Sequence, residues 1–195
     1  MNEFVFDKVL HRYTLNGSEL ISVTKALNLA GLIDDRWFTD EARDRGRAVH
    51  DAVLFHIQDD LVYESISPIA LPYFKAFLKC EKEENLKYII NLCEKPQYSL
   101  EPLYSGMPDI ICYSRGRPWQ LEMKTGSWET AAYQTAAYDH FDEIRPLFAQ
   151  RFCLRLFPDE TYKLTRFTDP NDFNVFCSAL NIAKLKFRPT LIDLN

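Results

Sequence analysis

Three features are missing from this sequence of 195 residues: a long apolar run, closely spaced cysteines and an excess of basic charge. No apolar run approaches the length that spans a bilayer, and the N-terminus is unlike a signal peptide. We therefore expect no membrane segment and a cytoplasmic protein. The five cysteines are scattered, and no pair has the close spacing typical of zinc or iron–sulfur ligands. We accordingly assign neither a metal–thiolate cluster nor a disulfide framework.

The formal net charge of −5 argues against a protein that binds polyanions over its whole surface. The charge is unevenly distributed, because acidic side chains outnumber basic ones in residues 1–110 and nearly balance them in residues 111–195. This distribution still allows a local basic groove, and several of the acidic residues could belong to a metal site.

Apolar periodicity and turn residues predict helices, then a series of strands, a helix, two strands and a last helix, with no internal repeat or linker. This order favours one α/β (α+β) domain over residues 1–195, with a mixed central sheet flanked by helices. Within it we expect an N-terminal β-meander (1–24), a core that carries the site (39–142), and C-terminal strands and a helix (150–188).

The individual elements follow from the same patterns. Asn16–Gly17 is the strongest hairpin signal, and Pro72 is expected to delay the start of the third helix. The predicted helices cover residues 22–30, 39–58, 67–85, 128–141 and 171–187. The predicted strands beyond the meander cover residues 86–93, 97–104, 107–113, 118–124, 151–157 and 161–167.

Two short motifs on predicted neighbouring strands are the most informative pattern: Gly106-Met107-Pro108-Asp109 and Glu122-Met123-Lys124-Thr125-Gly126. If the turn between them has an even number of residues centred on Arg115–Gly116, Asp109 lies opposite Glu122. Their side chains are then about 5 Å apart on one face, and Lys124 shares that face. A turn with an odd number of residues would move Glu122 to the other face.

Two carboxylates at this separation repel each other unless a cation lies between them. Oxygen ligands suit Mg²⁺ or Mn²⁺ better than zinc. The ammonium group of Lys124 could then stabilise charge on a phosphate or align an attacking water. The alternative is a surface hairpin whose charges face water, and either motif alone would favour it. The order of the motifs, their spacing and the helix that follows favour the metal site.

His50 and Glu94 are further candidates for this site. His50 shares a face of the predicted helix 39–58 with Gly46 and with apolar residues, so it could be a core histidine. Gly46, one turn earlier, leaves room for a ligand or another backbone. Glu94 could join the metal site or simply end a strand, and both interpretations stay open. His11 and His56 have no such context, and we assign them structural roles.

Polar side chains after the second motif could contact a phosphate. Gln134 and Tyr138 are four residues apart on the predicted helix 128–141 and share a face. Ser127 stands near the start of that helix, where free backbone N–H groups favour anions. Arg47, in the arginine-rich segment 43–47, could reach a phosphate backbone. Each of these residues could instead be solvated surface or part of a polar stripe.

Taken in order, His50, the two strand motifs and Gln134-Thr135-Ala136-Ala137-Tyr138 resemble the PD-(D/E)XK nuclease superfamily. The resemblance is to its RecB-type branch, which includes phage and prophage exonucleases and uses this glutamine–three residues–tyrosine form. It is specific over residues 46–138, and the segment 13–24 is also similar to the start of that branch.

The resemblance implies a restriction-endonuclease-like fold and a DNA exonuclease of recombination or repair that uses Mg²⁺ or Mn²⁺. It makes Asp109, Glu122 and Lys124 the catalytic residues, with Lys124 orienting water or stabilising the pentacovalent transition state. The implied metal ligands are His50, Asp109, Glu122 and the Met123 carbonyl. The assigned substrate-binding residues are Gln134, Tyr138, Thr125, Ser127 and Arg47.

Some members of the branch hold an iron–sulfur cluster through a cysteine that precedes the histidine motif. No cysteine precedes His50, so we expect no such cluster. These 195 residues also contain no helicase segment, so processive unwinding would need a partner such as a helicase, and an annealing protein of recombination is another expected partner.

Two alternatives stay open. The chain could be a nucleic-acid binding or assembly module that keeps this fold without turnover, or a sequence-specific endonuclease on the same core. The complete Asp–Glu–Lys set argues against the first, because binding alone has no use for an acidic pocket.

Overall fold

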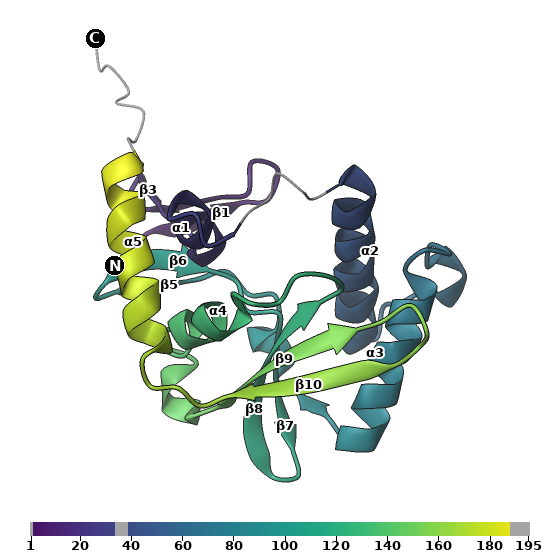
Figure 1. Cartoon of the computed structure of the whole chain (residues 1–195). Helices are drawn as coiled ribbons and strands as arrows, with labels where there is room; N and C mark the ends of the chain where they lie inside the picture. Colours follow the sequence, from purple (N-terminus) through teal and green to yellow (C-terminus); the bar gives the residue numbers. More distant parts are fainter. Residues whose placement is uncertain (1, 34–38, 188–195) are drawn as a thin grey trace.

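The computed structural model describes residues 2–33 and 39–187, and its centre is a five-stranded mixed sheet (Figure 1). The strand order is β10-β9-β8-β7-β4. Strands β8 and β9 run parallel, and the other neighbours are antiparallel. The strands are β4 (Lys87–Tyr88), β7 (Ile110–Ser114), β8 (Arg117–Lys124), β9 (Gln150–Leu156) and β10 (Tyr162–Phe167). This confirms the predicted α+β class with a mixed sheet flanked by helices.

Helices lie on both sides of the sheet, as Figure 1 shows. The α-helices are α1 (Val23–Leu29), α2 (Asp40–Ile57), α3 (Leu71–Glu84), α4 (Ala131–Tyr138) and α5 (Asp172–Lys186). Helices α2 and α3 share a buried core with Leu121 and Leu154, whereas α1, α4 and α5 share a second core with Ile111. Because side chains alternate along a strand, each face of the sheet has its own apolar layer.

Within the described residues, two small sheets and three short 3-10 helices complete the fold. The small sheets are the meander β1 (Phe4–Asp7), β2 (Arg12–Leu15) and β3 (Ser18–Leu20), and the hairpin β5 (Gln97–Leu100) and β6 (Leu103–Gly106). The 3-10 helices are η2 (Tyr63–Ser65), η3 (Ile90–Leu92) and η4 (Arg145–Leu147). The Ser105 N–H donates to the Ile21 carbonyl at 3.0 Å and so ties β6 to the end of the meander.

Local sequence signals explain most element boundaries. The Ser22 hydroxyl accepts a hydrogen bond from the Lys25 N–H, and the Thr39 hydroxyl accepts one from the Ala42 N–H, so both residues are N-caps. Pro72 lies in the first turn of α3, which starts at Leu71 rather than residue 67. The Asn16–Gly17 turn has positive φ at both residues and joins β2 to β3.

Two of the predicted strands are wrong in extent. In segment 86–93 only β4 pairs with the sheet, and the chain then turns through η3. Segment 97–104 is not one strand but the hairpin β5–β6, broken at Glu101-Pro102, where proline has no N–H to donate to a ladder.

The segments around the second motif also differ from the prediction. Strand β7 starts at Ile110 rather than residue 107, because Pro108 has no N–H and its carbonyl accepts from the Glu94 N–H at 2.9 Å. Helix α4 spans Ala131–Tyr138 rather than 128–141. The Glu129 carboxylate accepts from the Ser127 hydroxyl and the Trp128 N–H, and these bonds keep residues 127–129 out of the helix.

The cysteines, the absence of a membrane-spanning helix among the described residues and the end of the predicted C-terminal segment can also be compared with the structure. Cys93, Cys112 and Cys153 are buried free thiols. Within the described residues, no helix combines the length and the apolar character that crossing a membrane requires. The last residue of the predicted segment 150–188 lies outside the described residues.

Candidate functional site

The turn between the two motifs sets their register. Arg115 and Gly116 form a two-residue turn with φ of 50° and 77°, the left-handed conformation that a tight hairpin requires at both positions. Ser114 pairs with Arg117 and Ile110 pairs with Leu121. The register agrees with the predicted one, but the pairing ends at Ile110 and Leu121, so the direct opposition of Asp109 and Glu122 stays a prediction. The Met123 N–H donates to Asp109 Oδ2 at 2.6 Å and holds the carboxylate in place.

Three side chains from distant segments meet beside this hairpin. His50 comes from α2, Glu94 from the segment after η3, and Asp109 from the residue before β7. His50 Nδ1 lies 3.2 Å from Glu94 Oε1 and 3.6 Å from Asp109 Oδ1. One ligand atom from each residue lies within 4.8 Å of the other two, so the three could hold a metal ion. The structure thus places Glu94, which the sequence left undecided, within the cluster.

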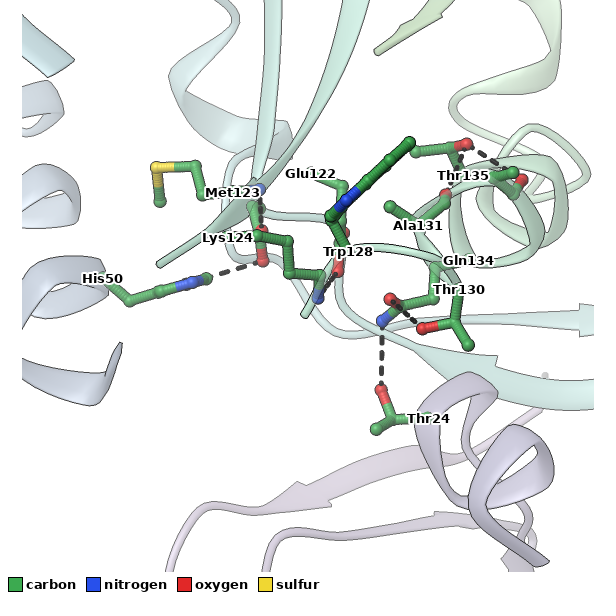
Figure 2. A network of polar contacts seen from close by, with 12 residues as sticks. Thr24, His50, Glu122, Met123, Lys124, Trp128, Thr130, Ala131, Gln134 and Thr135 are labelled. Carbon is green, nitrogen blue, oxygen red and sulfur yellow. Dashed lines mark hydrogen bonds and ion pairs between the residues drawn. The ribbon is translucent and has the colours of Figure 1, made fainter. Parts of the chain in front are cut away.

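Glu122 and Lys124 form a pair next to this cluster (Figure 2). Lys124 Nζ donates to Glu122 Oε1 at 2.8 Å. Glu122 is 3% exposed, and its second oxygen, Oε2, is buried without a hydrogen-bond partner. A buried carboxylate oxygen without a partner costs free energy and is rare, so this atom has capacity for a further ligand.

The buried charges shift one another's pKa values. Burial, and then the Asp109 charge, raise the pKa of Glu122 to about 7 against the opposing effect of Lys124. Burial also raises the pKa of Asp109. For His50, burial lowers the pKa, but Asp109 and Glu94 more than offset this and raise it to about 9. Glu122 and Asp109 together overcome burial and raise the pKa of Lys124.

These features fit a hard divalent cation. Two buried carboxylates with raised pKa values are groups whose repulsion a cation would relieve. The donor set is oxygen with one imidazole nitrogen, which suits Mg²⁺ or Mn²⁺. The unpartnered Glu122 Oε2 adds a buried acceptor on the side facing away from the Lys124 bond.

Two adjoining cavities open around the site. A larger groove of about 630 Å³ lies between the N-terminal half of α2, the end of β8 and the start of α4. A smaller pocket of about 260 Å³ contains Glu94, Asp109 and Glu122. His50, Lys124, Thr24 and Gln134 line both cavities. The site therefore has a continuous opening to solvent along α2.

The assigned substrate-binding residues divide between these cavities. Arg47, Thr125 and Ser127 line the groove, and Tyr138 lines the pocket. Gln134 lies between them and bonds to two threonines: its Nε2 donates to Thr24 Oγ1, and its Oε1 accepts from Thr130 Oγ1 (Figure 2). Met123 lines the groove, and a role of its carbonyl as a ligand stays a prediction.

The meander brings residues that the sequence did not point to. His11 and Tyr13 from the meander line the smaller pocket, as does Thr24 from the start of α1, so the purely structural role assigned to His11 misses its position at the site. His56 instead pairs with Glu81 at 3.1 Å on the far part of α2, in keeping with a structural role. No local signal in the sequence links residues 11–24 to the core, so only the fold reveals this proximity.

A comparison with models of known protein families found no match, and a comparison with curated proteins also found none. The relation to PD-(D/E)XK nucleases therefore rests on the motifs and stays a prediction.

Proposed function

We propose that the protein is a metal-dependent nuclease that hydrolyses phosphodiester bonds in DNA, with a restriction-endonuclease-like fold of the RecB type. The observation that carries the proposal is the grouping of the buried Asp109 and Glu122 and the partly buried Lys124 beside His50 and Glu94. His50 and Lys124 also line the groove of about 630 Å³, which adjoins the pocket that holds the three carboxylates.

The ligands of the proposed cation are His50, Asp109 and Glu122, with Glu94 added by the structure and the Met123 carbonyl as a further candidate. When bound, Mg²⁺ or Mn²⁺ supplies charge neutralisation on a phosphate and lowers the pKa of a water. Asp109 can bind the cation through Oδ1, because Oδ2 already accepts a hydrogen bond from the Met123 N–H.

Lys124 has the position and charge for the chemical step. Its raised pKa keeps the ammonium group protonated at neutral pH, and only one of its three N–H bonds is directed to Glu122 in the structure. The remaining N–H groups can donate to a phosphate oxygen or to the attacking water.

The groove supports a strand of nucleic acid as the substrate. It is lined by Arg45 and Arg47 from α2 and by the backbone after β8, so phosphates entering it meet basic side chains. The motifs favour an exonuclease of recombination or repair, acting with a helicase or an annealing protein.

The direct test compares end-labelled linear, nicked and covalently closed DNA in the presence of Mg²⁺. We expect degradation of linear DNA. Lys124→Ala should lower its rate by about 100-fold or more, because a positioned acid–base or electrostatic group contributes about that much. Lys87→Ala, at an exposed lysine on β4, is the matched control and should keep full activity. Circular dichroism and thermal melting check that both variants fold.

Other outcomes separate the alternatives. Undiminished cleavage by Lys124→Ala would remove this lysine from the mechanism. Cutting of the closed circle at fixed positions, without trimming of ends, would identify a sequence-specific endonuclease. Binding of DNA without hydrolysis in Mg²⁺ or Mn²⁺ would identify a binding module without turnover.

A further inference from the structure

A row of three cations crosses the central sheet from the candidate site to the sheet edge. Lys124 on β8 pairs with Arg155 on β9, and Arg155 pairs with Lys163 on β10. Neighbouring strands lie about 4.8 Å apart, so the three residues follow one another across the sheet at that spacing. Lys124 and Arg155 are more than thirty residues apart in the sequence, and only the pairing of β8 with β9 places them side by side.

The three side chains share one face of the sheet. Leu154 and Leu156 belong to the core with α2 and α3, so Arg155 between them faces the other side. Residues that pair directly lie on the same face, which puts Lys124 and Lys163 beside Arg155. Lys163 is exposed at the edge strand β10.

Arg155 is held in position without being neutralised. Its guanidinium carbon lies 5.1 Å from the centre of the Trp128 ring and 5.2 Å from that of Phe157. Its Nε is buried without a hydrogen-bond partner, and within residues 2–33 and 39–187 no ion pair reaches its guanidinium. Stacking on two aromatic rings restrains the planar group and leaves its N–H donors available.

Two charged residues near Arg155 differ from it, because their polar groups have partners in the structure. Arg151, four residues earlier on the same face of β9, is fully engaged by Asp172 at 2.9 Å and by backbone carbonyls. Glu129, whose charge acts on Arg155, accepts from the Ser127 hydroxyl at 2.6 Å and from the Trp128 N–H at 2.9 Å, both through Oε2, and makes no ion pair with Arg155 within residues 2–33 and 39–187. Arg151 therefore has a structural role, whereas Arg155 keeps an unused positive charge next to the site.

We propose that Lys124, Arg155 and Lys163 form a phosphate-binding track that holds the nucleic-acid strand as it leaves the site. This inference rests on the proposed nuclease function. Arg155 binds the phosphate next to the one at Lys124, and Lys163 binds one further along. A guanidinium restrained in a plane matches two phosphate oxygens at once, which a lysine in its place would not do.

The test measures binding separately from hydrolysis. A fluorescently labelled single-stranded oligonucleotide is titrated in EDTA at several salt concentrations, and anisotropy gives the dissociation constant. Arg155→Gln should weaken binding about tenfold, as expected for a lost hydrogen-bonded charge contact. A plot of the logarithm of the binding constant against the logarithm of the salt concentration should also become less steep, by about 0.7 in its slope, since one phosphate contact is lost. Lys163→Gln should act in the same direction by roughly threefold.

Two further variants control for folding and for general charge. Arg166→Gln removes an exposed cation from the same strand as Lys163 but on the opposite face, since its partner Phe152 belongs to the α2–α3 core. It should bind as the wild type does. Arg155→Lys should recover part of the affinity only. Lys163 is exposed, so Lys163→Gln tests the track even if a variant of Arg155 melts at a lower temperature.

The outcomes distinguish this inference from the proposed function. If the wild type binds and degrades DNA and the Arg155 and Lys163 variants match it in affinity and slope, the track is refuted and the nuclease stands. Equal losses for Arg166→Gln and Arg155→Gln would also refute it, because the effect would then be one of net charge. If the wild type neither binds DNA nor degrades it with Mg²⁺, the proposed function itself fails.

Discussion

Asp109 performs two tasks with its two oxygens. Oδ2 accepts from the Met123 N–H at 2.6 Å, and Oδ1 faces His50 at 3.6 Å. The first contact joins the start of β7 to β8 and so orients the carboxylate. The second leaves an oxygen directed into the His50–Glu94–Asp109 cluster. A substitution of Asp109 can therefore remove its negative charge and still keep an oxygen that accepts the hydrogen bond from the Met123 N–H.

Asp109→Asn keeps an oxygen that can accept from the Met123 N–H but removes the negative charge. We expect the affinity for Mn²⁺ to fall by roughly 10- to 100-fold, at least the loss seen for groups that only support a ligand. Isothermal titration calorimetry measures it. Glu129→Gln, at an exposed acid lining the groove, is the control and should bind as the wild type does. An unchanged affinity for Asp109→Asn would reject its role as a ligand.

Glu94 raises the pKa of His50 through a hydrogen bond and through its charge. In the metal-free protein, Glu94→Gln should therefore lower the pKa of His50 below its value of about 9. NMR titration of the imidazole signals checks this, and metal binding by the same variant should also weaken. If the pKa of His50 does not move, the 3.2 Å contact between the two side chains does not govern its titration.

At the scale of elements, Gly106 lets β6 pass close under α4. A Cβ atom at this position would lie 2.8 Å from the Tyr138 ring and 3.2 Å from side-chain atoms of Phe141 and Val23. The Tyr104 hydroxyl also donates to the Ala137 carbonyl at 2.6 Å. This close packing sets the place of α4, and with it the positions of Gln134 and Tyr138 relative to β8.

Gly106→Ala should lower the free energy of unfolding by about 1–3 kcal/mol, because the added methyl group overpacks a buried contact. Gly46→Ala makes the same chemical change inside α2, where the nearest atom to a new Cβ is Thr125 Oγ1 at 3.8 Å. It should raise the free energy of unfolding by up to about 1 kcal/mol through helix propensity. Urea unfolding measures both. Equal effects of the two substitutions would show that packing against Tyr138 does not limit position 106.

At the scale of the whole molecule, the site lies where the two helical layers meet the end of the sheet. α2, on one side, contributes His50, and the opposite face of β8 contributes Glu122 and Lys124. The like charges that gather there are buried by packing elsewhere in the molecule. Their repulsion therefore opposes folding until a proton or a cation relieves it.

The stability of the metal-free protein should fall as the pH rises from about 5 to 9. Folding raises the pKa of Glu122 from 4.5 to about 7 and that of His50 from 6.5 to about 9. The folded state thus binds more protons than the unfolded state over this range, and stability falls with pH wherever that holds. The contribution of Glu122 is lost between about pH 4.5 and 7, and that of His50 as the pH passes through about 9.

Thermal melting in EDTA at pH 5, 7 and 9 measures this effect. Glu122→Gln should flatten the decrease between pH 5 and 7, because the variant has no carboxyl group to titrate there. Added Mg²⁺ should raise the melting temperature more at pH 9 than at pH 5, since a cation competes with protons for the same ligands. A melting temperature that rises with pH in EDTA would contradict the assignment of the shifted groups.

The sequence alone determined those features of the fold that depend on residues close together in the chain. The hydroxyl caps at Ser22 and Thr39 and the turn at Arg115–Gly116 depend on dihedral angles and hydrogen bonds among near neighbours. This turn sets the register of β7 against β8, so the pairing of Ile110 with Leu121 followed from counting residues. Predicted strands failed at Pro102 and Pro108, where a missing N–H ends pairing inside an apolar run.

Only the tertiary structure decided which distant segments meet at the site. Glu94 joins the cluster because the chain turns through η3 and returns to the Pro108 carbonyl. His11 reaches the smaller pocket because β6 fastens the meander to the core. Arg155 stands beside Lys124 because β9 pairs in parallel with β8. Such contacts depend on the relative packing of whole elements, which no window of neighbouring residues contains.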